Sequence, residues 1–143
     1  MRFLTDTHTL VWALSTPDSL GAGARAALAE FPFTASVANL WELVLKARKP
    51  GALVADPLPW WEKYVIGRRI PALAIRAAHI RRLAGLPDLH KDPFDRILVA
   101  QALAERLTLL TKDGLLARYG VPVVWERRRR SAADAPGSIA GPR

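Results

Sequence analysis

Cysteine is absent from the sequence, which excludes disulfide bonds and thiolate metal sites and is compatible with a reducing compartment. A long apolar run is also absent, so we expect no membrane-spanning segment and no membrane partner. The N-terminal segment does not follow a signal-peptide pattern, because Asp6 and His8 interrupt its apolar residues early. Together these absences predict a cytoplasmic protein.

Histidine is scarce, and the three residues His8, His79 and His90 do not follow a zinc-binding spacing such as H-E-x-x-H. We interpret His79 as a surface residue, because the segment around it is rich in arginine. His8 and His90 flank acidic residues, which is compatible with a role near a phosphate group. The histidines therefore do not indicate a zinc site.

Acidic residues are the minority among the charged residues: 13 Asp and Glu face 21 Lys and Arg, a net charge of +8. This excess suggests a polyanionic partner, most simply nucleic acid. Residues 127–143 contain five Arg and one Asp and so carry half of the excess, which solubility explains as well as nucleic-acid binding does. We expect one domain over residues 1–126 and a basic, mostly disordered tail over residues 127–143.

Short strand-like segments alternate with segments of helical periodicity along the chain. The expected strands are residues 2–5, 32–35, 71–75, 107–111 and 121–125. The expected helices are residues 7–14, 22–30, 36–49, 58–66, 76–83, 93–106 and 114–118. This alternation predicts an α/β fold in which helices cover both faces of a parallel sheet.

Three acidic residues lie where a parallel α/β fold binds its ligands. Asp6 and Asp113 directly follow expected strands, and Asp95 lies at the start of the apolar helix 93–106. Ligands bind at the carboxyl edge of such sheets, where strand ends and helix starts meet. Each residue also has a structural interpretation: Asp6 and Asp113 as turn or cap residues, and Asp95 as part of a capping box with Asp92 at the N-cap.

Glu42 differs from these three, because a helical wheel places it on the polar face of its helix. The apolar residues Val37, Leu40, Trp41 and Val44 form a stripe on the other face. This pattern favours a solvated Glu42 that pairs with Lys46 one turn later.

The acidic residues occur in four motifs along the chain. These are F-L-T-D-T-H at 3–8, S-V-A-N-L-W-E-L at 36–43, H-K-D-P-F-D-R-I-L-V-A-Q-A at 90–102 and L-L-T-K-D at 109–113. In this order and spacing they resemble the PIN-domain ribonucleases, and within them the VapC-type toxins of toxin–antitoxin pairs. The resemblance covers residues 1–125.

The resemblance implies a three-layer α/β/α sandwich with a parallel sheet of four to five strands. It implies that Asp6, Glu42, Asp95 and Asp113 form a catalytic Mg²⁺ or Mn²⁺ site, against the wheel-based interpretation of Glu42. Asp92 matches a neighbour of that site, and we expect Thr111 and His8 beside it as well. The family further implies a homodimer and a cognate antitoxin that blocks the active site.

The chemistry of these residues agrees with that implication. Carboxylate oxygens without histidine or cysteine ligands suit Mg²⁺ or Mn²⁺, and such an ion can activate water and polarise a phosphoryl oxygen. We therefore expect a metal-dependent endoribonuclease in which Glu42 binds metal or orients the attacking water. Five basic residues could follow the RNA backbone, namely Lys46, Arg48, Lys91, Arg96 and Lys112.

Three other functions are compatible with parts of the sequence. A phosphohydrolase of the haloacid dehalogenase type requires a second Asp two residues after Asp6, where this chain has His8. A response-regulator receiver requires an Asp after the third strand, where Ile75 leads into Arg76. A non-catalytic basic α/β module that binds RNA would use its acidic residues as helix caps, and metal-dependent cleavage distinguishes it from a nuclease.

Overall fold

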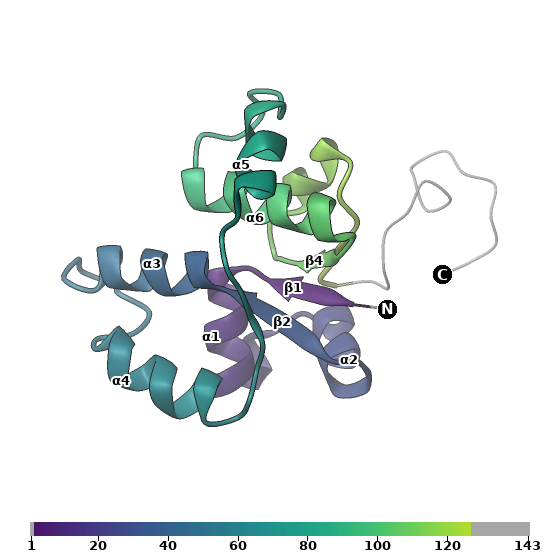
Figure 1. Cartoon of the computed structure of the whole chain (residues 1–143). Helices are drawn as coiled ribbons and strands as arrows, with labels where there is room; N and C mark the ends of the chain where they lie inside the picture. The colour runs from purple at the N-terminus through teal and green to yellow at the C-terminus, as the bar shows by residue number, and fades with distance from the viewer. Residues whose placement is uncertain (1, 127–143) are drawn as a thin grey trace.

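The computed structural model describes residues 2–126 and contains a five-stranded sheet. Helices surround this sheet (Figure 1). All pairings are parallel, and the strand order is β3-β2-β1-β4-β5. The strands are β1 (Phe3–Thr5), β2 (Phe33–Ser36), β3 (Ala72–Leu73), β4 (Thr108–Leu110) and β5 (Val123–Val124). The predicted parallel α/β architecture is confirmed. The expected tail, residues 127–143, lies outside the described residues.

The helices agree with the expected positions to within a few residues. They are α1 (Thr7–Ser15), α2 (Ala22–Glu30), α3 (Val37–Lys46), α4 (Pro57–Trp61), α5 (Ala77–Ala84) and α6 (Pro93–Glu105). Two 3-10 turns, η1 (Pro17–Ser19) and η3 (Gly114–Tyr119), and a π-helical turn, η2 (Glu62–Ile66), complete the list. The expected helix 58–66 is therefore α-helical only at its start.

Successive residues of the strands face two separate apolar layers, as the period of two along a strand requires. Leu4 and Leu109 pack in one cluster with Leu98 of α6. Phe3 and Leu110 pack in another cluster with residues of α2 and β5. Figure 1 shows α5 and α6 on one side of β1 and β2, and α1 and α2 on the other. The result is the expected three-layer sandwich.

Two helix starts follow the local rules read from the sequence. Ser36 is the N-cap of α3, where its Oγ accepts from Ala38 N at 3.0 Å and Asn39 Oδ1 accepts from Ser36 N at 2.8 Å. Asp92 is the N-cap of α6, where its Oδ1 accepts from Phe94 N at 2.8 Å. Each cap satisfies backbone donors that a helix start leaves without a partner.

The chain order within the sheet creates a crevice beside β1. After β1 the chain builds β2 and β3 on one side, and it returns to the other side for β4 and β5. The carboxyl ends of β1 and β4 therefore lie next to each other at a topological switch point, where open α/β sheets bind ligands. The backbone N–H of Asp6 donates to Leu110 O at 3.1 Å across this point. Within residues 2–126, no helix has the length and apolar character needed to cross a membrane.

Candidate metal centre

One cavity of about 350 Å³ lies at this crevice, and acidic side chains dominate its wall. All four residues of the expected metal site line it, although they come from four separate parts of the chain. Its lining consists of Asp6, Thr7, His8, Trp12, Glu42, Lys46, Asp92, Asp95, Lys112 and Asp113. Five carboxylates that share one partly enclosed space repel one another and require a compensating positive charge.

Asp6 caps α1 and borders the cavity at the same time. Its Oδ1 accepts from Thr9 N at 2.9 Å, so the structural interpretation as a cap is correct. Burial raises the pKa of the Asp6 carboxyl, while hydrogen bonds with Thr111 and Thr9 act in the opposite direction. Because an N-cap uses one carboxylate oxygen, the cap does not exclude a second role for the side chain.

Asp113 is held from both sides at the start of η3. Its Oδ1 accepts from Leu115 N at 3.0 Å, and its own backbone N–H donates to Thr111 Oγ1 at 3.0 Å. Thr111 is buried, and it contacts both strand-end acidic residues through these hydrogen bonds. Thr111 therefore lies beside two of the four residues of the expected metal site.

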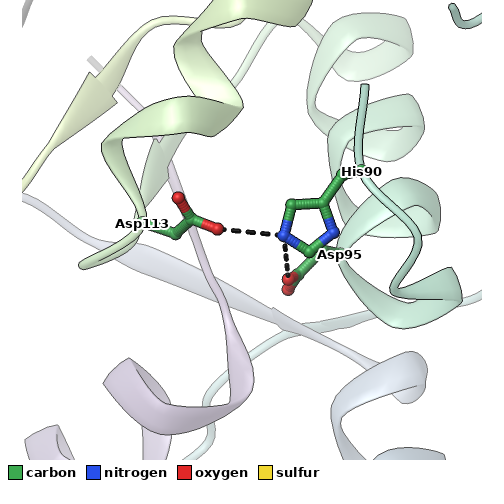
Figure 2. A group of neighbouring side chains, drawn as sticks. All are labelled: His90, Asp95 and Asp113. Atoms are coloured by element: carbon green, nitrogen blue, oxygen red, sulfur yellow. Dashed lines mark hydrogen bonds and ion pairs between the residues drawn. The ribbon is translucent and has the colours of Figure 1, made fainter. Parts of the chain in front are cut away.

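His90 lies between Asp95 and Asp113, as Figure 2 shows, although the expected site residues did not include it. Its Nε2 is 3.0 Å from Asp113 Oδ2 and 3.5 Å from Asp95 Oδ2. The backbone N–H of Asp92 donates to His90 Nδ1 at 3.1 Å, so a neutral ring carries its proton on Nε2 and donates it to the carboxylates. The signal in the sequence was the position of His90 in the same motif as Asp95.

The atoms of His90, Asp95 and Asp113 that could bind a metal lie within 4.8 Å of one another. A metal on His90 Nε2 would require the proton on Nδ1, where it would face the N–H of Asp92. The local hydrogen bonds therefore favour His90 as a donor to the two carboxylates rather than as a ligand.

The Asp95 carboxyl is strongly perturbed by its surroundings in the cavity. Burial, together with the nearby charges of Asp92 and Asp6, raises the pKa of Asp95 to about 7, and His90 acts in the opposite direction. The proposed capping box is absent from the described structure, because the backbone N–H of Asp92 bonds to His90 Nδ1 instead of to Asp95. The Asp95 side chain is thus available to the cavity.

Glu42 corrects the helical-wheel interpretation. Glu42 is only 7% exposed, whereas Trp41 of the apolar stripe is 54% exposed and Val44 is 49% exposed. The expected pair with Lys46 is present at 2.6 Å, but Glu42 is not a solvated surface residue. The polar face of α3 points inward because the buried Thr7 hydroxyl of α1 donates to Glu42 and accepts from Asn39, so both buried polar groups have a hydrogen-bond partner.

Two further expectations about basic side chains need correction or refinement. His79 is fully buried instead of lying at the surface, with Arg76 N donating to its Nδ1 and its Nε2 at 2.9 Å from Glu105 Oε2. Arg96 bonds to Pro87 O at 2.8 Å, which ties it to the loop before α6. Of the five basic residues expected near RNA, the cavity lining includes Lys46 and Lys112.

The composition of the cavity fits a hard divalent cation. Carboxylate oxygens are the ligands that Mg²⁺ and Mn²⁺ prefer, and no cysteine is present in the sequence to favour a softer metal. Burial, and after it the charges of neighbouring carboxylates, raise the pKa of Asp95, and a cation would offset the repulsion between these carboxylates. His8 borders the same cavity, and its ring lies 5.3 Å from the Trp12 ring.

Comparisons with solved structures show where this fold occurs. A chain of VapBC2 from Rickettsia felis, bound to a DNA fragment from its promoter, has a TM-score of 0.62 at 15% identity and covers 87% of this chain and 99% of its own. A chain of FitAcB from Neisseria gonorrhoeae has a TM-score of 0.59 at 18% identity, and the match covers 85% of this chain and 95% of that one. A chain of DNA-bound VapBC from Salmonella typhimurium has a TM-score of 0.61 at 19% identity, and the match covers 86% of this chain and 96% of that one. At these identities the similarity establishes the fold.

Comparisons of sequence place the chain in a family. None of the curated proteins matches it. The sequence profile of the PIN domain matches residues 3–122. This span includes the strands β1 to β4 and every acidic residue of the cavity. The chain therefore belongs to the PIN domain family.

Proposed function

We propose that this protein is a metal-dependent endoribonuclease and the toxin of a toxin–antitoxin pair. The observation that carries the proposal is the convergence of five carboxylates on one cavity at the switch point of the sheet. Membership of the PIN domain family and the fold shared with chains of the VapBC structures support it.

Asp6, Asp95 and Asp113 would hold Mg²⁺ or Mn²⁺, since they lie at the two strand ends and the helix start that border the cavity. When bound, such an ion would lower the pKa of a coordinated water and neutralise charge on the phosphoryl group during an in-line displacement. Glu42 would orient the attacking water or complete the ligand set, because its carboxylate is buried against the same space. Lys46 and Lys112, which also line the cavity, would contact phosphates of the RNA backbone next to the one that is cleaved.

A second, smaller cavity suggests a path for the RNA. It has a volume of about 160 Å³ and shares Thr7, His8, Glu42 and Lys46 with the acidic cavity. From there it continues past Lys49 to Leu53, over both basic and apolar side chains. Single-stranded RNA suits such a surface, because its bases can leave the stack and its backbone can approach the carboxylates.

The exposed face of α3 supports a homodimer. Apolar side chains on successive turns of this helix remain open to solvent, namely Val37, Trp41, Val44 and Leu45. A contiguous apolar face on a soluble protein is typical of an interface. We assign it to a second copy of the chain, and we assign the acidic cavity to the part of the antitoxin that blocks catalysis.

One observation favours a non-catalytic RNA-binding module as the alternative. Asp6, Asp92 and Asp113 each cap a helical segment, as that interpretation requires. Glu42 and Asp95, however, accept no cap hydrogen bond in the described structure and still border the cavity. A purely structural set of acidic residues leaves these two without an explanation.

Cleavage assays with purified protein test the proposal. Single-stranded RNA should be cut with Mg²⁺ or Mn²⁺ and left intact with EDTA. Asp6→Asn retains an N-cap residue and Asp95→Asn retains the size of the side chain, yet each should abolish cutting. Full activity of either variant at matched thermal stability would refute the assignment, and metal-independent binding without cleavage would favour the alternative.

A further inference from the structure

Thr7 and Asn39 form a buried polar contact directly behind Glu42. Thr7 is the first residue of α1, Asn39 lies in the first turn of α3, and both side chains are almost fully buried. Thr7 Oγ1 donates to Glu42 Oε1 at 2.6 Å, and Asn39 Nδ2 donates to Thr7 Oγ1 at 3.1 Å and to Thr5 O at 3.4 Å. The contact joins α1 and α3 through two residues that are 32 positions apart in sequence.

The direction of these hydrogen bonds is determined by the backbone. Asn39 Oδ1 accepts from the N–H of Ser36, so the other end of the amide must be the Nδ2 donor. Thr7 Oγ1 accepts from that donor and has a single proton, which it gives to Glu42. Thr7 therefore presents a donor to Glu42, and the partner that this geometry favours is an ionised carboxylate.

The contact is anchored to α6, which lies on the other side of the sheet from α1. Ser36 Oγ donates to Gln101 Oε1 of α6 at 2.6 Å, and Gln101 is itself fully buried. Ser36 thus holds Asn39 through its backbone and α6 through its side chain. A side chain fixed in this way by buried hydrogen bonds loses little further entropy when it positions its partner.

The second oxygen of Glu42 is held from the solvent side, since Lys46 Nζ lies 2.6 Å from Oε2. Each oxygen of Glu42 consequently has one partner: the buried Thr7 hydroxyl on Oε1 and the partly exposed Lys46 ammonium on Oε2. Lys46 is on a flexible stem, so the internal partner determines where the carboxylate stays when the lysine moves.

We infer that Thr7 and Asn39 are positioning residues that hold the Glu42 carboxylate at the acidic cavity for metal and water. This inference rests on the proposed function, because it assigns a task to Glu42 within that site. Hydrogen bonds of this kind orient carboxylates around metal ions and are separate from the ligands themselves.

Manganese binding measured by electron paramagnetic resonance tests the inference without relying on catalysis. Thr7→Val removes the donor at nearly constant shape, and we expect Mn²⁺ affinity to fall about tenfold, the size typical of such orienting contacts. Thr7→Ser keeps the hydroxyl and should bind Mn²⁺ within about twofold of the original protein. In RNA cleavage, kcat should fall for Thr7→Val while KM changes little.

Thr5→Val is the matched control. The Thr5 hydroxyl is also buried beside the site, but it has no hydrogen-bond partner among residues 2–126. This variant should bind Mn²⁺ and cut RNA like the original protein. Equal losses for Thr5→Val and Thr7→Val, or unchanged Mn²⁺ affinity in Thr7→Val, would overturn the inference, because a packing change would then explain the data.

Two further measurements cover the remaining outcomes. If Thr7→Val does not fold, Thr7→Ala tests the same contact, since it removes the same hydroxyl donor with a smaller side chain and should weaken Mn²⁺ binding equally. If the original protein binds no Mn²⁺, the proposed function fails, and a crystal structure of metal-free Thr7→Val decides the inference. A rotated Glu42 side chain supports it, and an unmoved one refutes it.

Discussion

Lys46 Nζ lies 2.6 Å from Glu42 Oε2, which places a positive charge at the rim of the acidic cavity. The hydrogen bond with Glu42 raises the pKa of Lys46, and the charges of Asp92 and Asp95 add to the rise, while partial burial opposes it. The lysine thus remains charged and supplies part of the compensation that the carboxylates need. A divalent cation at the same cavity would compete with it.

Replacing Lys46 should therefore strengthen metal binding and weaken RNA binding. In Lys46→Met, Mn²⁺ affinity should rise about threefold to fivefold. This corresponds to the loss of about 1 kcal/mol of repulsion between the solvent-screened lysine and the cation. KM for RNA should rise, because a phosphate contact is lost. Isothermal titration with Mn²⁺ checks the first effect and cleavage kinetics the second. Lys49→Met is the control for the Mn²⁺ titration alone, since Lys49 lines the adjoining cavity and not the acidic one. A fall in Mn²⁺ affinity in Lys46→Met would contradict the expectation.

The pKa of Asp95, raised to about 7, should make the metal-free protein less stable as pH rises. The folded state retains the Asp95 proton between about pH 4 and pH 7, where the unfolded state has released it, so folding loses free energy across that window. The loss from this one group is at most about 4 kcal/mol. Urea unfolding with EDTA at pH 5 and pH 8 measures the part of this loss that lies above pH 5, at most about 3 kcal/mol. Asp95→Asn should show a smaller pH dependence, and an identical dependence would refute the assignment.

Removing the imidazole of His90 should leave metal binding largely intact if the ring only donates hydrogen bonds to Asp95 and Asp113. We expect Mn²⁺ affinity of His90→Gln within about threefold of the original value, whereas Asp113→Asn should lose at least about tenfold. Calorimetric titration of both variants makes the comparison. A loss in His90→Gln as large as that in Asp113→Asn would identify His90 as a metal ligand.

The exposed face of α3 should be required for self-association. Leu45 is 56% exposed, so Leu45→Lys should not disturb the fold but should place a charge in the proposed dimer interface. We expect a shift from dimer to monomer by size-exclusion chromatography with light scattering. Leu58→Lys changes an equally exposed leucine on α4 and should remain dimeric. Identical behaviour of the two variants would remove the support for this interface.

Much of the fold could be predicted because local patterns act within one or two turns of chain. Asp92 was recognisable as an N-cap from its neighbours alone, and it caps the expected helix. The strand-like segments around Leu4 and Leu109 pair in a parallel sheet, as their alternation with helices required. Asp6 and Asp113 lie close together because each follows one of these two adjacent parallel strands.

The sequence by itself determined the elements, their order and the strand-end carboxylates, because periodicity, caps and parallel topology depend on residues close together in the chain. Only the tertiary structure decided which way α3 faces. A helical wheel assumes that apolar side chains point inward, yet Glu42 and Asn39 are buried while Trp41 is exposed. Hydrogen bonds to Thr7, 35 and 32 residues away in sequence, satisfy the buried polar groups and reverse that preference. His90 likewise meets Asp113 only after the chain has passed through α6 and β4.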